Sequence, residues 1–143
     1  LHLLSRRQRQ MCIRDRNWVG YMAGFMAVVG HVFPVYYGFR GGKGVLAAIS
    51  AIFTLDWRTG CLLLAVFIII VAVTRYVSLG SCIASSLYGF GTLGFVYFMD
   101  GDPAGIVCTF IAFFTAALVI YMHRGNIKRL AAHTEKKLGE KAK

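Results

Sequence analysis

Three glycines and a lysine gather in one short stretch of the sequence, Gly41-Gly42-Lys43-Gly44, directly before an apolar run that begins at Val45. Glycine lets the backbone approach a ligand closely, and consecutive N–H groups at the start of a helix bind anions. Lys43 adds a full positive charge, so a phosphate or an acyl-phosphate group suits this chemistry. The stretch is not a P-loop, because its spacing is one residue short and no Ser or Thr follows the lysine. The alternative is a tight glycine turn with a lysine that only marks one side of a membrane.

A second candidate lies where the last apolar run gives way to the basic C-terminal segment. His123, Asn126 and Arg129 stand at i, i+3 and i+6, so they share one face if the helix continues past the apolar run. An imidazole, an amide and a cation on one face can hold a polar substrate at the membrane surface. The alternative is an ordinary basic flank that contacts anionic lipid.

Two serines form a third candidate. Ser78 and Ser81 follow Arg75 at the start of another apolar run. Hydroxyl groups at the beginning of a helix are more often caps than ligands. The sequence has no His-Glu-x-x-His pattern and its four cysteines form no Cys-x-x-Cys pair, so neither a zinc site nor a disulfide framework is supported.

The elements that must position these residues are predicted to be membrane-spanning helices. Hydrophobic residues make up 57% of the 143 residues and charged residues only 15%, whereas a soluble domain carries about 25% charged residues. Residues 18–37, 79–99 and 104–122 are each long enough to span a bilayer, which takes about 20 apolar residues. Residues 60–74 are slightly short and residues 45–55 clearly short, so these two form short helices or one broken hairpin. Backbone polar groups in hydrocarbon need partners, so we predict an all-α polytopic bundle of about five spans.

The net charge of +10 sits at the two ends of this apolar body. Residues 1–16 carry a net charge of +4, residues 123–143 carry +5, and the residues between them carry +1. This distribution favours a membrane protein over one that binds nucleic acid. The positive-inside tendency places the segments around Lys43 and Arg75 and the C-terminal tail in the cytoplasm. All three candidate groups then lie on one side of the membrane, which favours a functional role for each.

Residues 1–16 do not fit this orientation, because their positive charge would lie outside. They lack the apolar core of a signal peptide, and residues 11–16 resemble translated sequencing-adaptor sequence. We therefore expect residues 1–16 to be a non-native leader and residues 17–143 to be a single transmembrane domain with a basic cytoplasmic tail, whose true N-terminal part is missing. The alternative is a genuine basic leader on a protein of opposite orientation.

The residues of these motifs resemble those of a known family, the bacterial acyl-phosphate:glycerol-3-phosphate acyltransferases. Residues 30–45 resemble the second motif of the family, residues 123–135 its third, and residues 75–81 the segment between them. The resemblance runs in order from about residue 18 to residue 135. The family's first motif, a Gly/Ser/Asn-rich loop that ends in an arginine, is absent together with two of seven spans. Three residues also depart from the usual pattern: Gly125 replaces an acidic residue, His133 a glycine and Leu46 an alanine.

The resemblance implies transfer of a fatty acyl group from acyl-phosphate to the 1-hydroxyl of glycerol 3-phosphate, which gives lysophosphatidic acid and phosphate for phospholipid biosynthesis. It implies a multi-pass protein of the bacterial inner membrane, with its active site and C-terminus in the cytoplasm, that contacts membrane lipids and needs no cofactor. Lys43, His123 and Asn126 would be catalytic. The residues that would bind phosphate or substrate are Gly41, Gly42, Gly44, Ser78, Ser81 and Arg129.

The sequence does not identify the group that accepts the proton, and it leaves two alternative functions open. Either His123 or the phosphate of the substrate could take the proton of the hydroxyl group. A small transporter or channel subunit could bind an anion in the glycine–lysine loop, but substrate pathways need ionisable residues within the spans and only His31 is one. A structural membrane protein would leave the clustered glycines and the shared face of His123 and Asn126 unexplained.

Overall fold

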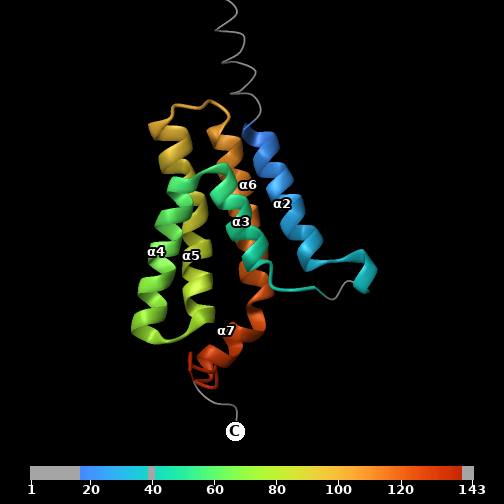
Figure 1. Cartoon of the computed structure of the whole chain (residues 1–143), viewed down its shortest axis with the longest axis vertical. Helices are drawn as coiled ribbons and strands as arrows, with labels where there is room; N and C mark the ends of the chain where they lie inside the picture. The colour runs from blue at the N-terminus through green and yellow to red at the C-terminus, as the bar shows by residue number, and fades with distance from the viewer. Residues whose placement is uncertain (1–16, 39–40, 140–143) are drawn as a thin grey trace, which may run out of the picture.

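The computed structural model of this chain describes residues 17–38 and 41–139. All regular elements within these residues are helical. In chain order they are α2 (Asn17–Val32), η1 (Val35–Tyr37), α3 (Val45–Leu55), α4 (Trp57–Thr74), α5 (Val77–Thr92), η2 (Leu93–Met99), α6 (Gly105–Met122) and α7 (Arg124–Ala131). The long helices run alternately down and up the molecule (Figure 1), so the predicted all-α bundle is confirmed.

A helix forms at each of the five predicted segments, the fourth of which is divided between α5 and η2, and two helix ends differ from the prediction by three or more residues. The first helix, α2, ends at Val32 rather than at residue 37, because Pro34 lacks an N–H group and disfavours helical backbone in the residue before it. The helix α4 begins at Trp57 rather than at residue 60. Its start is set by the side chain of Asp56, which accepts a hydrogen bond of 3.2 Å from the N–H group of Arg58.

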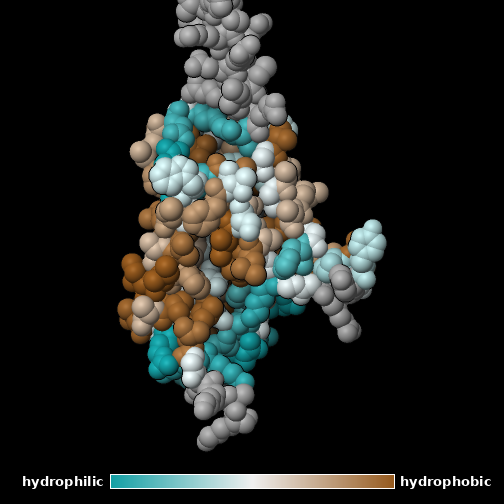
Figure 2. Space-filling model, viewed as in Figure 1, coloured by the Kyte–Doolittle hydropathy of each residue, from teal (hydrophilic) through white to brown (hydrophobic). Residues whose placement is uncertain are grey.

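Three helical stretches of the described residues are long and apolar enough to cross a membrane: Trp57–Thr74, Val77–Met99 and Gly105–Met122. α2, with 16 residues, and α3, with 11, are shorter. On the face shown in Figure 2, hydrophobic residues cover the middle of the bundle and hydrophilic residues lie at both ends. Large apolar side chains such as Ile69 and Val73 on α4 point outward, with exposed fractions of 62% and 79%. Such a surface suits lipid rather than water.

Close packing of α2 on α3 depends on two glycines. A Cβ atom on Gly20 would lie 2.7 Å from the side chain of Leu55, and one on Gly24 would lie 3.1 Å from that of Ala51. Small residues spaced four apart let helix backbones approach in this way. α2 also packs on α6, and α5 packs between α4 and α6. The helix that carries the glycine–lysine stretch at its start is therefore held against the rest of the bundle.

The end of the bundle opposite the candidate site is closed by polar contacts between turns. Arg58 donates to Asp100 over 3.0 Å and to the buried Asp56 over 3.2 Å. The hydrogen bonds from Arg58 hold the pKa of the Asp100 carboxyl below its ordinary value. Asn17, the first residue of α2, donates to the buried Asp102 over 2.7 Å. These contacts tie the starts of α2 and α4 to the turn that precedes α6.

Candidate functional site

The structure brings the three candidate groups to one end of the bundle. The turn between α4 and α5 and the short helix α7 lie at the lower end in Figure 1, and the connection between α2 and α3 leaves α2 at its lower end. The other connections, from α3 to α4 and from η2 to α6, lie at the upper end. Ser78 and Asn126, which lie 48 residues apart in sequence, are in direct contact there.

Four side chains form a connected polar cluster at this end. Glu135 accepts hydrogen bonds from the Ser78 hydroxyl over 2.6 Å, from Nδ2 of Asn126 over 2.9 Å and from Nε of Arg129 over 2.8 Å. Asn126 Nδ2 also donates to the Ser78 hydroxyl. The Asn126 amide nitrogen is thus bonded to two protein oxygens. The amide oxygen, Oδ1, remains as the group that can accept a hydrogen bond from a ligand.

His123 marks a break between two helices rather than a position within one. It ends α6 and precedes α7 with φ −87° and ψ 2°, and α7 turns away from the axis of α6 (Figure 1). Its side chain is 2% exposed. Ring Nδ1 lies 2.8 Å from the carbonyl oxygen of Val119. Because a carbonyl group only accepts, Nδ1 must carry the hydrogen, and neutral His123 therefore presents Nε2 as an acceptor.

The glycine–lysine loop is pressed against the end of α2. A Cβ atom on Gly41 would lie 2.2 Å from the carbonyl oxygen of His31 and 2.5 Å from that of Val32, so the backbone leaves no room for a larger residue. Gly44 has φ +78°, a left-handed conformation that favours glycine, and it caps the start of α3 without a side-chain hydrogen bond. Lys43 is exposed. Two of the glycines therefore have a packing role, as the tight-turn interpretation requires.

A small apolar cluster connects this loop to the end of α6. Val28, Val32, Ala48 and Val119 pack together. A Cβ atom on Gly44 would lie 3.9 Å from the side chain of Val119, the residue whose carbonyl group holds the ring of His123. The loop and the histidine are thus positioned by the same packing contacts.

Comparison with known proteins identifies the family. The family model for glycerol-3-phosphate acyltransferase matches residues 3–133 of the chain. The chain belongs to the glycerol-3-phosphate acyltransferase family. The predicted resemblance is thereby confirmed. The matched range takes in most of residues 1–16, which lie outside the described residues, and the idea that they are a non-native leader stays a prediction.

Curated relatives and solved structures agree with this membership. A glycerol-3-phosphate acyltransferase of Clostridioides difficile (strain 630) is 43% identical over 127 residues, which are 89% of this chain and 58% of the relative. One of Synechococcus sp. (strain CC9902) is 34% identical over 89% of this chain and 60% of the relative. The chain thus spans about three fifths of the length of these relatives.

Two crystal structures of PlsY (YgiH), an integral membrane glycerol 3-phosphate acyltransferase, share the fold. The match to the glycerol 3-phosphate form has a TM-score of 0.67 and 28% sequence identity. It covers 92% of this chain and 72% of the PlsY chain. The lysophosphatidic acid form has a TM-score of 0.66 and covers 92% and 74%. With these relatives and its apolar helices, the chain is a multi-pass membrane protein.

Sequence reasoning on the family motifs missed the role of Glu135. There Glu135 is only the last residue of the motif at residues 123–135, whereas the structure makes its carboxylate the centre of the polar cluster. The hydrogen bond from Ser78, followed by the contacts with Arg129 and Asn126, holds the pKa of Glu135 below its ordinary value. One signal was available in the sequence, since Glu135 is one of only two acidic residues in the basic segment of residues 123–143.

The two serines have different surroundings. Ser78 is engaged on both sides, because its hydroxyl donates to Glu135 and accepts from Asn126. Ser81 donates to the carbonyl group of Val77, one turn earlier in α5, over 3.0 Å. Their use in binding substrate remains a prediction, and in this structure both hydroxyls bond to protein groups.

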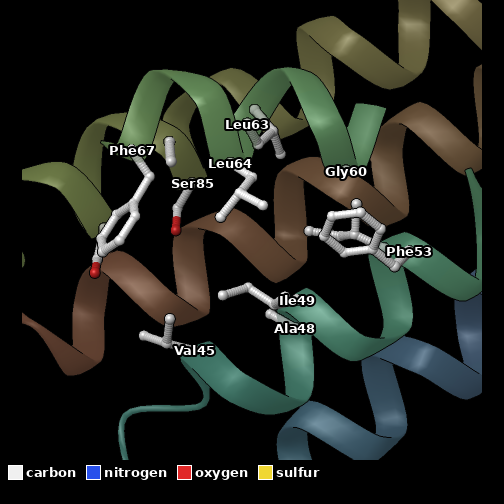
Figure 3. A pocket seen from close by; sticks show the side chains of 12 residues that line it. Val45, Ala48, Ile49, Phe53, Gly60, Leu63, Leu64, Phe67 and Ser85 are labelled. Carbon is white, nitrogen blue, oxygen red and sulfur yellow. The ribbon is translucent and has the colours of Figure 1, made fainter. Parts of the chain in front are cut away.

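An apolar groove between α3, α4 and α5 opens beside the loop (Figure 3). Its walls are almost entirely hydrocarbon. Its lining includes Val45, Ile49, Phe53, Leu64, Phe67 and Ser81. Val45 directly follows Gly44, so one end of the groove adjoins the glycine–lysine loop. No group of three His, Cys, Asp or Glu residues that could hold a metal ion occurs within the described part of the chain.

Proposed function

We propose that this chain supplies catalytic residues for acyl transfer from acyl-phosphate to glycerol 3-phosphate, which yields lysophosphatidic acid and inorganic phosphate. One observation carries the proposal: a partly buried polar cluster and a cation-bearing glycine loop lie at the same end of the bundle as an apolar groove that adjoins that loop. An enzyme that joins a water-soluble anion to a fatty acyl chain needs both surfaces next to each other. Membership of the family supports the same substrates.

The proposed roles follow from the groups left available for ligands. Lys43 and the N–H groups around Gly41, Gly42 and Gly44 would hold a phosphate group, helped by the start of α3, where the cap residue offers no side-chain hydrogen bond. His123 Nε2 would accept a hydrogen bond from the reacting hydroxyl group. Asn126 Oδ1 would accept another from glycerol 3-phosphate.

The chemical step needs little beyond this positioning. The 1-hydroxyl oxygen of glycerol 3-phosphate attacks the carbonyl carbon of the acyl-phosphate, the bond from that carbon to the phosphate oxygen breaks, and phosphate leaves. The hydroxyl proton passes to His123 or to a phosphate oxygen of the substrate. Because the donor is already activated, the protein has to orient two anions and stabilise charge at the carbonyl oxygen. The apolar groove would take the acyl chain and bring the mixed anhydride to the loop.

We propose the cytoplasm as the side on which this site opens. The α2–α3 connection with Lys43, the α4–α5 turn with Arg75 and the start of the basic tail lie at the end of the bundle that carries the site, whereas the turn before α6 at the opposite end contains Asp100 and Asp102. Basic residues are retained on the cytoplasmic side of membranes. Residues 17–143 would then form one transmembrane domain, and its water-soluble substrate would arrive from the cytoplasm.

An acyl-transfer assay tests the proposal. Membranes that contain this chain, and membranes that contain a version extended at its N-terminus with the part of the Clostridioides difficile relative that it does not cover, are supplied with acyl-phosphate and glycerol 3-phosphate. We expect lysophosphatidic acid from the extended protein and little or none from the 143 residues alone. Lys43→Ala and His123→Ala in the extended protein should abolish the product while the protein still inserts. Near-normal turnover in both variants would remove the proposed roles.

A further inference from the structure

A short C-terminal tail returns to the bundle and clasps the turn between α4 and α5. Beyond the end of α7, the N–H group of Leu138 donates to the carbonyl group of Arg75 over 2.8 Å. The guanidinium group of Arg75 donates to the carbonyl group of Leu138 over 2.7 Å. Both polar backbone groups of Leu138 are thus held by one residue that lies 63 positions earlier in the chain. Two bonds to one residue fix both the position and the direction of the tail.

The clasp is made of polar contacts rather than buried apolar area. Leu138 is 56% exposed. Next to it, Lys137 Nζ lies 5.6 Å from the centre of the Tyr76 ring, within range of a cation–π contact. Because Leu138 buries little apolar surface, polar contacts hold it at the turn, and the guanidinium group of Arg75 supplies the bond to the Leu138 carbonyl.

Arg75 occupies a position where glycine would be the ordinary choice. It ends α4 with φ +62°, and its N–H group closes the helix by donating to Val71 over 2.8 Å. Glycine is preferred at such left-handed helix ends because it has no Cβ atom. The chain has an arginine there instead, and the side chain that glycine would lack is the one that reaches Leu138. The local backbone therefore indicates that the side chain has a use that offsets the strain.

The clasp determines where the carboxylate of Glu135 lies. Glu135 stands three residues before Leu138, between the end of α7 and the clasp, and its side chain is 9% exposed. A turn at His133, with φ +54°, sends the chain back from α7. With the tail held at α7 on one side and at Arg75 on the other, the carboxylate is directed at Ser78 and Asn126. It orients the amide nitrogen of Asn126 inward and leaves Oδ1 for a ligand.

We propose that Arg75 is a positioning residue for the polar site: through its clasp on Leu138 it fixes Glu135, and through Glu135 it fixes the side chain of Asn126. This inference rests on the proposed function only for its effect on turnover. The docking of the tail does not depend on what the site binds. Arg75 itself touches neither substrate in this scheme.

The variant Arg75→Gly separates this role from a general role in folding. Glycine adopts φ +62° without strain and keeps the backbone bonds to Val71 and Leu138, so only the guanidinium contact is lost. The matched control is His133→Gly, which places glycine at the other left-handed non-glycine position and removes no hydrogen bond that the side chain makes within the described residues. We expect the Tm of neither variant in detergent micelles to fall.

Amide hydrogen exchange of the 143-residue chain reports the clasp directly. In Arg75→Gly the amides of residues 134–139 should exchange on the order of tenfold faster than in the unchanged chain, as expected when a hydrogen bond from a charged group is lost. In His133→Gly they should not. Unchanged exchange in Arg75→Gly would overturn the proposal, since the tail would then be held without the guanidinium.

Turnover of the N-terminally extended protein tests whether Arg75 acts on the site through Glu135. Arg75→Gly should lower kcat/KM about tenfold at unchanged Tm, and the double variant with Glu135→Gln should be no worse than Glu135→Gln alone. Additive losses, or normal kcat/KM in Arg75→Gly, would overturn the positioning role. If the extended protein without substitutions makes no lysophosphatidic acid, the proposed function fails by itself, and the exchange measurement then decides for or against the clasp.

Discussion

Gly41 gives the sharpest test of the idea that the loop geometry serves the site. A Cβ atom there would meet the carbonyl oxygens of His31 and Val32 at 2.2 and 2.5 Å and Cδ of Pro34 at 2.6 Å. Contacts below about 3 Å are not tolerated, so Gly41→Ala must move the loop by roughly 1 Å, and overpacking of this kind costs about 1–3 kcal/mol. Because the opposing atoms belong to the backbone and to a proline ring, they cannot rotate away.

A displacement of this size predicts a large kinetic defect. A misplacement of about 1 Å near a reacting centre can lower the rate on the order of a hundredfold. We therefore expect Gly41→Ala in the extended protein to lower kcat/KM by roughly ten- to a hundredfold and to lower the Tm. The loss should come mainly from a higher KM for the substrate whose phosphate group the loop holds.

Two neighbouring glycines serve as matched controls for Gly41→Ala. Gly30→Ala lies near the end of α2 with nothing within 4 Å of the added Cβ atom, so it should leave kcat/KM unchanged and stabilise α2 slightly. Gly42→Ala would meet Nε2 of His31 at 2.6 Å, but that ring is exposed and can turn, so its effect should be intermediate. Equal KM and Tm values for Gly41→Ala and Gly30→Ala would refute the assignment of the loop.

Three further predictions concern the tail, pH and the opposite end of the bundle. Glu135→Gln keeps the shape of the side chain but removes its charge, and we expect kcat/KM to fall by roughly tenfold to a hundredfold in the acyl-transfer assay. Because the pKa of Glu135 is lowered in the folded protein, its contribution to stability is present above the ordinary pKa of glutamate, about 4.3, and is lost as the pH falls through the lower folded value. Amide exchange of residues 134–139, corrected for intrinsic rates, should therefore rise on acidification below about pH 4 and should not respond between pH 6 and 8. Asn17→Ala removes the hydrogen bond to the buried Asp102 and should cost about 1–3 kcal/mol in thermal unfolding with kcat/KM unchanged.

The positions of the helices were predictable from the sequence because hydrocarbon allows few alternatives. Uncharged apolar runs in hydrocarbon are expected to be helical, and the structure has helices at all five predicted segments, including the two that are shorter than a membrane span. The ends of these helices depend on single residues that a hydropathy pattern does not weigh. Pro34 stops α2 early, and the side chain of Asp56 starts α4 before the apolar run begins.

The polar cluster was only partly predictable. Spacing along one helix indicated that His123, Asn126 and Arg129 belong together, but the helix bends at His123, and the partner that organises the other two lies outside the helix. Glu135 reaches Ser78 across 57 residues because the tail folds back. A fold-back held by polar contacts leaves no periodic pattern of apolar residues, so periodicity cannot reveal it.

The structure also changes how the two interpretations of the glycine–lysine loop relate to each other. The tight turn and the phosphate site entered as alternatives, yet the close contacts at Gly41 and the left-handed backbone at Gly44 show that the turn is real. A loop packed this tightly is preorganised, which is what an anion site made of backbone N–H groups requires. The positively charged side chains near the site differ in whether they are already bonded to protein groups. Arg129 is paired with Glu135 and Arg75 with the tail, whereas no carboxylate within the described residues forms an ion pair with Lys43. The tight turn therefore supports the phosphate site, because it holds an uncompensated cation in a fixed backbone frame.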